Sequence, residues 1–348
     1  MMIVRPVCTN DLADLYALSF KTGAGLTTFP SDKVALKNKI DASLKAFSGV
    51  PDLREKRDYL LVMEDTSSGK VVGTSGISTG VGLDKPFYTY RILHITQECR
   101  ELKKRVDTKL LQMANDYVGA SEVMTLFLDP DYRTGYNGKL LSKARYMLIA
   151  AHENRFADII ISEVRGWVDE NNRSPFWQAI GKPFFQMEFD EADRVSGAGN
   201  SQFISDLMPR FPIYTTLLPK DAQEVIGKPH DMARGAIKLL ELEGFRKVGS
   251  VDIFDGGPTF MAHRNLIWTV SHCKKGKIAG VVDGSSAKSL TLVANPNIEN
   301  FKVALTNVVE TESGDWLPAH AAKELDIQAG DTIVFAPLKL HHEEDVAL

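Results

Sequence analysis

Residues 125–141 combine the features that a phosphate-binding loop needs. A short apolar run is followed by a polar turn, by Arg133 with two nearby glycines, and then by an amphipathic segment typical of a helix. The first amides of a helix lack partners within it, and the helix dipole there favours an anion. Glycine allows a ligand to approach the backbone closely, and an arginine can fork onto phosphate oxygens. The segment therefore predicts a phosphate site that includes Arg133, Gly135, Asn137 and Gly138.

His230 is the second residue whose position indicates chemistry. It follows Gly227-Lys228-Pro229 and precedes Asp231 and an expected helix over residues 232–243. A histidine titrates near neutral pH and can give or take a proton. A helix start disfavours the imidazolium whereas Asp231 favours it, so the sequence leaves the direction of the pKa shift open.

Neither a metal site nor a covalent intermediate is predicted. Cys8, Cys99 and Cys273 are odd in number and far apart, so we expect each to be a small buried hydrophobic residue. None lies in a motif that indicates a nucleophile. We expect the pair His341-His342, near the end of the chain, to be solvated and not to bind metal.

The composition is that of a globular protein. The 348 residues are 44% hydrophobic and 25% charged, with a formal net charge of −4. Without a concentrated basic surface, nucleic acid is not expected as a main partner. The N-terminus lacks a signal peptide pattern, and no apolar run approaches the roughly 18 residues of a membrane span. We therefore expect a cytoplasmic protein that does not enter the membrane.

The elements that must position these residues predict an α+β fold with a mixed β-sheet flanked by helices. They are a strand over Ile3–Val7 followed by a capped helix, a β-hairpin over residues 59–73, a strand over 158–164, and a helix opened by Ser174 and Pro175 and stopped by Gly181.

Beyond Pro258 the sequence changes to short β-rich runs separated by Gly, Asn, Ser and Asp. The expected strands are Ile267–Val270, Ile278–Val282, Ser289–Val293, Phe301–Leu305 and Thr332–Phe335. Their spacing points to a small β-barrel-like domain. We therefore expect an α+β domain at 1–258 that holds the candidate loop and histidine, a β-rich domain at 259–340 and a tail at 341–348.

The loop spacing resembles the R-x-x-G-x-G/A motif of the GNAT acyl-CoA N-acyltransferases, which holds the pyrophosphate of CoA. Tyr136 stands where the middle glycine belongs, and Gly135 lies one step early. Longer segments spread over the whole chain resemble arginine N-succinyltransferase. They are residues 21–30, 125–133, 137–143, 174–178, 207–209, 225–230 and 252–258. The resemblance implies transfer of succinyl from succinyl-CoA, a cosubstrate and not a bound cofactor, to the α-amino group of L-arginine, the first step of arginine catabolism by succinyl transfer.

The same resemblance implies roles for individual residues. His230 matches the histidine regarded as the catalytic proton donor. The backbone of Leu126, and of Leu128 in the same strand, is expected to hold the thioester carbonyl and the pantetheine arm. Many GNAT enzymes place a proton-donating tyrosine in the helix where this chain has Phe176 and Trp177, so acid–base work must lie elsewhere.

Two alternatives stay open at this point: succinyl transfer to ornithine, and a CoA-binding subunit without turnover, which Tyr136 would favour. A homo-oligomer or a hetero-oligomer with a paralogous subunit is also compatible with the sequence. A guanidinium requires a carboxylate partner. The residues in segments that could face the cleft, none of which the sequence assigns as a ligand, are Lys21, Thr22, Glu163, Arg165, Asp169 and Glu170.

Overall fold

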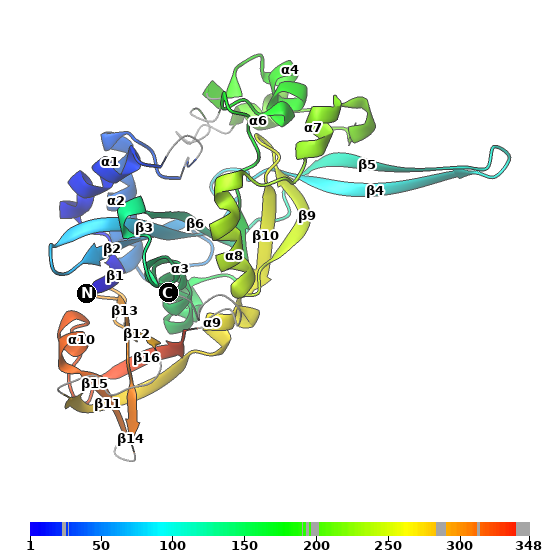
Figure 1. Ribbon diagram of the computed structural model, residues 1–348. Coiled ribbons are helices and arrows are strands. Elements are labelled where there is room, and N and C mark those ends of the chain that lie inside the picture. Colours follow the sequence, from blue (N-terminus) through cyan, green and yellow to red (C-terminus); the bar gives the residue numbers. More distant parts are fainter. Residues whose placement is uncertain are drawn as a thin grey trace.

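The computed structural model describes residues 1–22, 26, 28–189, 191–192, 195, 202–282, 290–311 and 314–338. Sixteen strands of this part of the chain form one mixed sheet in the order β14-β15-β11-β16-β12-β13-β1-β2-β3-β6-β7-β10-β9-β4-β5-β8. Helices cover both faces of its central strands (Figure 1). The expected tail 341–348, with His341-His342, lies outside the described residues.

The strands of the first part are β1 (Met2–Pro6), β2 (Arg57–Asp65), β3 (Lys70–Thr79), β4 (Thr89–Cys99), β5 (Lys104–Ala114), β6 (Ser121–Leu128), β7 (Ile159–Glu163), β8 (Ile213–Tyr214), β9 (Arg246–Asp252) and β10 (Pro258–His263). The later strands are β11 (Lys274–Val282), β12 (Thr291–Asn295), β13 (Lys302–Thr306), β14 (Val309–Thr311), β15 (Gly314–Pro318) and β16 (Thr332–Pro337).

The α-helices are α1 (Leu12–Ser19), α2 (Lys33–Ser48), α3 (Asn137–Ala151), α4 (Lys182–Phe185), α6 (Gln202–Leu207), α7 (Lys220–Val225), α8 (Arg234–Leu242), α9 (Trp268–Ser271) and α10 (Ala319–Glu324). A π-helical turn, Trp177–Gly181, precedes α4.

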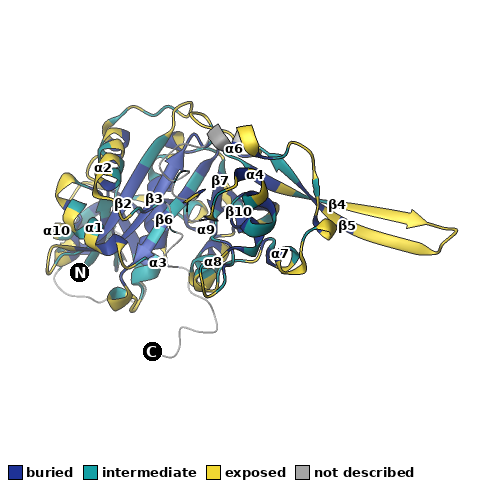
Figure 2. Cartoon of the chain, turned by 90° about the horizontal axis from the view of Figure 1, so that it is seen from above, coloured by how far each residue is buried: buried dark blue, intermediate teal, exposed yellow. Residues whose placement is uncertain are grey.

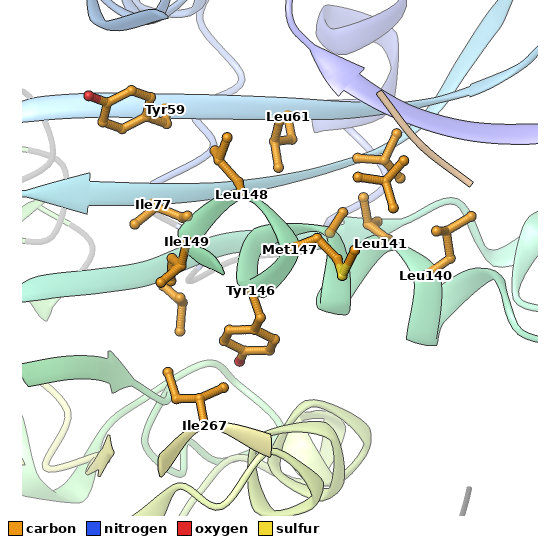
Figure 3. Packing of buried hydrophobic residues seen from close by; sticks show 14 of the residues in the cluster. Tyr59, Leu61, Ile77, Leu140, Leu141, Tyr146, Met147, Leu148, Ile149 and Ile267 are labelled. Atoms are coloured by element: carbon orange, nitrogen blue, oxygen red, sulfur yellow. The ribbon is translucent and has the colours of Figure 1, made fainter. Parts of the chain in front are cut away.

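Helix α3 lies at the centre of the largest core. Leu148 lies beside the sheet residue Leu61 and Ile149 beside Ile77, while Tyr146 points away from these strands toward Ile267 (Figure 3). The opposite face of β2 and β3 packs against α1 and α2 through a separate cluster. Because strand side chains alternate between faces, each central strand is apolar on both sides, as a sheet covered by helices on both faces requires.

The hairpin of β4 and β5 is a feature that we did not predict. Its strands pair from Thr89–Ala114 to Cys99–Lys104. Beyond the sheet the hairpin projects as a long arm whose outer part is exposed (Figures 1 and 2). Cys99, which we expected to be buried, is exposed near its tip.

The predicted strand Ile267–Val270 is wrong, because Trp268–Ser271 forms the helix α9. The backbone N–H of Trp268 donates to the Glu243 carbonyl at 3.0 Å, and that of Thr269 donates to the Glu243 carboxylate at 2.8 Å. Glu243 is fully buried in an ion pair with Lys143 of α3. This tertiary contact fixes the first turn of a helix, and a four-residue apolar run cannot reveal it.

The helix after Ser174 begins as predicted but ends later. The Ser174 hydroxyl accepts the Trp177 N–H at 3.1 Å, with Pro175 in the first turn. Gly181 does not stop the helix, which continues through α4 to Gln186, a residue with φ of 54°. A Cβ on Gly181 would lie 2.1 Å from the Trp177 ring, so the glycine makes room for the indole inside the helix.

The later strands extend the same sheet. β13 pairs antiparallel with β1, and β10 pairs with β7 and β9. Hydrogen bonds therefore connect residues on both sides of position 258. The division into two domains at that position, and the barrel-like closure of the second, stay predictions.

Candidate active site

The parallel strands β6 and β7 separate shortly after they meet. Within the described residues they pair at Ser121–Ile160 and Glu122–Ile161. The Ser162 hydroxyl then donates to the Val123 carbonyl at 3.1 Å. We call the place where this strand pairing ends the β6–β7 fork.

Thr125 bends β6 at the fork. Its φ of 54° is left-handed, which is unusual for a β-branched residue, and the pairing of β6 with β3 shifts register at the same place. Such strain costs about 1–3 kcal/mol and persists only where the surroundings impose it. Leu126 follows the bend and has no cross-strand partner in β7. The backbone role expected of Leu126 stays a prediction.

The conformation of the loop after β6 explains why Tyr136 is tolerated. Gly135 has a φ of 52°, so the left-handed residue of this loop is Gly135. Tyr136 has a φ of −104°, which any residue can adopt. The glycine that lies one step early in the motif therefore supplies the turn, and the middle position no longer needs one.

Short-range bonds hold this loop together. Arg133 Nε donates to the Leu128 carbonyl at 3.1 Å, and its guanidinium lies 5.6 Å from the centre of the Phe127 ring. Asn137 Nδ2 donates to the Tyr132 carbonyl at 3.0 Å. The structure thus brings the expected residues of the phosphate loop into one segment between β6 and α3. The side chain of Leu128 packs in the core.

The first turn of α3 leaves room for a ligand. A Cβ placed on Gly138 would meet no atom of the described residues within 4 Å. Tyr136 occupies the N-cap position but makes no capping bond with its side chain. The first amides of this 15-residue helix can therefore serve an anion, with the dipole adding to the attraction.

His230 lies at the helix start that leads into α8, as predicted. Its Nδ1 accepts the Met232 backbone N–H at 3.1 Å, so the neutral ring carries its proton on Nε2. Burial and the nearby Arg165 lower the pKa of His230, while Asp231 and Asp255 act in the opposite direction. Protonation of Nδ1 would also break the bond to Met232. The neutral imidazole is therefore favoured, which answers the question that the sequence left open.

A glycine-rich turn fixes His230 against the end of β7. The Asp255 carboxylate accepts the N–H of Gly166 at 2.7 Å and that of Gly257 at 2.8 Å. His230 donates its own N–H to the Arg165 carbonyl at 2.9 Å. A Cβ on Gly257 would lie 2.2 Å from the Val164 carbonyl oxygen, so only glycine fits there. The sequence analysis noted the segment 252–258 but assigned no role to Asp255.

Phe176 and Trp177 take no part in the site. Both are fully buried, and the Trp177 indole N–H donates to the Met187 carbonyl at 3.1 Å. Both residues therefore have structural roles in the core beside β9. In the part of the chain that the structure describes, no group of three or more His, Cys, Asp or Glu could hold a metal ion. Over the same residues, no helix has the length and apolarity that a membrane span requires.

A parallel strand pair that separates before a glycine turn and a helix start defines a GNAT-like acyl-CoA N-acyltransferase fold of the α+β class. Residues 2–269 match the family described as arginine N-succinyltransferase beta subunit. Arginine N-succinyltransferases of Escherichia coli strains 55989 and K12 are 39% identical to this chain over 337 residues, which is 96% of each protein. This chain therefore belongs to the arginine N-succinyltransferase family.

A solved structure agrees with this assignment. Subunit AI of the arginine/ornithine succinyltransferase from Pseudomonas aeruginosa superposes with a TM-score of 0.87 at 29% identity, over 98% of this chain and 99% of the other. The predicted fold class is thus confirmed.

Proposed function

We propose that this protein transfers the succinyl group of succinyl-CoA to the α-amino group of L-arginine, forming N2-succinylarginine and CoA in the cytoplasmic catabolism of arginine. The observation that carries the proposal is the β6–β7 fork in a member of this family. The candidate phosphate loop follows β6, and the segment of His230 lies against the end of β7.

The donor side would hold the CoA moiety. The proposed contacts are Arg133, Gly135, Asn137 and Gly138 with the pyrophosphate. The backbone of Leu126, with Leu128 beyond it, would align the thioester in the fork, since Leu126 has no partner in β7. Fixing both reactants in one orientation supplies a large part of the rate enhancement in such a transfer.

The acceptor side would manage protons. The arginine ammonium must lose one proton before its nitrogen attacks the thioester carbon and a second as the C–S bond breaks, while the thiolate takes one up. His230 is the proposed acid–base group for these transfers. Its Nε2–H can be offered to sulfur or to the oxyanion, but uptake of a proton requires the Met232 bond to Nδ1 to open.

Ornithine is a second candidate acceptor, because the Pseudomonas neighbour is described as an arginine/ornithine succinyltransferase. Thiol release from succinyl-CoA with each amine, followed by mass analysis of the product, tests both. Arginine-dependent release with a succinylarginine product supports the proposal. Equal kcat/KM with ornithine would overturn the arginine preference, and no release with either amine would favour a CoA-binding subunit without turnover.

We also propose that the protein assembles with a second copy or with a paralogous subunit. An isolated two-stranded hairpin is marginally stable in water, and the β4–β5 arm exposes Leu102 and Val106. Sedimentation of the parent and of a protein with a shortened arm would test this assembly.

A further inference from the structure

One face of the sheet is polar at the apex of the β6–β7 fork. Ile160 and Phe260 belong to the core around α3, whereas Ile161 and Met261 belong to a different cluster on the other face. Because side chains alternate along a strand, Glu163 shares the face of Ile161. Its register partner in β10 is Thr259, which therefore lies beside it on that face.

Two more carboxylates lie near Glu163. Glu122 precedes Val123, a residue of the α3 core, so it points to the opposite side, beside its register partner Ile161. Asp252 is the register partner of Thr89 in β4, its carboxylate accepts the N–H groups of Phe254 and Asp255, and its charge acts on Glu163. We call Glu122, Glu163 and Asp252 the carboxylate cluster.

Among the described residues, only carboxylates act on Glu163, at the centre of the cluster. Burial, followed by the charges of Asp252, Glu122 and Asp255, raises the pKa of Glu163. Every charge that acts on Glu163 in this way is another carboxylate. Burial raises the pKa of Glu122 to about 7, and Lys56 and Lys39 oppose this rise. Neither lysine acts on the pKa of Glu163.

Buried hydroxyl groups beside the cluster also lack partners. Thr259 and Thr89 are both 0% exposed, and the Oγ1 of each has no hydrogen-bond partner among the described residues. In the strand register, Thr259 lies opposite Glu163 and Thr89 lies opposite Asp252. Glu163 Oε1 is likewise buried without a partner. Buried polar atoms are rarely left unsatisfied, so three such atoms at one place favour the binding of a polar ligand there.

We propose that the carboxylate cluster, centred on Glu163 and assisted by the Thr259 hydroxyl, binds the guanidinium of the arginine substrate. This inference rests on the proposed function. A guanidinium offers five N–H donors in a plane and a positive charge, which matches a group of carboxylate and hydroxyl acceptors. The shared neighbour Asp255, whose charge acts on both His230 and Glu163, connects this cluster with the acid–base group.

The test is Glu163→Gln, which keeps the shape and removes the charge. The KM for arginine should rise about 10- to 100-fold, as expected for a lost charge-assisted bond, while CoA affinity measured by calorimetric titration stays unchanged. Glu153→Gln, which alters an exposed carboxylate, is the matched control and should leave KM unchanged. Thr259→Val should raise KM by a smaller factor of about 2 to 10.

Citrulline has a side chain that ends in a neutral ureido group of similar shape. Comparing it with arginine therefore tests whether the cluster recognises the positive charge. As a competitive inhibitor it should bind the parent much more weakly than arginine does, and Glu163→Gln should bring the two affinities close together. An unchanged KM for arginine, or an equal loss for arginine and citrulline, would overturn the proposal. A parent protein that does not use arginine would instead overturn the proposed function, so the two failures are distinguishable.

Discussion

The two sides of the β6–β7 fork are built in different ways. The donor side is one continuous segment in which the bonds of Arg133 and Asn137 span only five positions, although Lys21 also pairs with Asp129 at 2.6 Å. The acceptor side joins distant segments, since Asp255 accepts the Gly166 N–H across 89 positions. Asp255 is buried, whereas Asp131 of the donor loop has a side chain that is 83% exposed.

This difference predicts different responses to substitution. Contacts on the exposed donor loop should affect ligand affinity with little effect on folding, because water can replace what is lost. Contacts in the buried acceptor side should affect catalysis and stability together, because removing one partner leaves another group unpaired away from water.

The largest effect is expected at His230. His230→Ala should lower kcat by about 10²–10⁴-fold, the usual contribution of a positioned acid–base group. CoA affinity should hardly change, because the histidine belongs to the acceptor side. Steady-state kinetics and calorimetric titration measure the two quantities.

His230→Gln decides which property of the ring matters. An amide can donate a hydrogen bond but cannot cycle a proton near neutral pH, so we expect no rescue. Recovery of kcat to within about threefold of the parent would mean that the ring acts only as a hydrogen-bond donor, and the acid–base role would be wrong.

Asp255→Ala should lower stability and catalysis together, as expected for the acceptor side. The Gly166 and Gly257 N–H groups would lose their partner, and each unsatisfied group costs about 1–3 kcal/mol, partly offset because a carboxylate no longer has to be buried. We expect a loss of about 2–4 kcal/mol in unfolding free energy together with a lower kcat. Chemical denaturation measures the first quantity.

Asp131→Ala is the matched change on the donor side. Its exposed carboxylate should contribute less than about 0.5 kcal/mol to stability. Equal losses of unfolding free energy in Asp255→Ala and Asp131→Ala would contradict the difference between the two sides.

Arg133→Ala should affect binding alone. Loss of a charge-assisted phosphate contact typically costs about 1.5–3 kcal/mol, which corresponds to a CoA affinity about tenfold to hundredfold lower. The kcat at saturating succinyl-CoA should stay near that of the parent. Unchanged affinity in a calorimetric titration would remove Arg133 from the site.

The same difference decides what the sequence could predict. The donor loop was predictable because Arg133, Gly135 and Gly138 are close together in the sequence and their spacing has a physical meaning. The role proposed for His230 comes from a segment that resembles the family. The register of Glu163 with Thr259 arises only when strands almost 100 residues apart pair, and no local pattern carries it.

The two errors in secondary structure have the same origin. The run Ile267–Val270 is apolar enough for a strand, but the buried Glu243 carboxylate and carbonyl receive the first N–H groups of a helix there. Gly181 looks like a helix stop, yet the Trp177 ring occupies the space that a side chain at position 181 would need. In both places a tertiary contact overrides the local preference.

The smallest effect is expected at Tyr136, the departure from the family motif. Its φ is ordinary, and its ring lies 5.4 Å from Lys139 Nζ, a contact on the loop surface. Tyr136→Gly should therefore leave CoA affinity within about threefold of the parent, a change below roughly 0.7 kcal/mol. Gly135→Ala is the contrasting variant, because its φ of 52° costs an alanine about 1–2 kcal/mol. If calorimetric titration showed that Tyr136→Gly weakens CoA binding more than Gly135→Ala does, the tyrosine itself would contact the ligand, and the loop would depend on its side chain in place of the glycine turn.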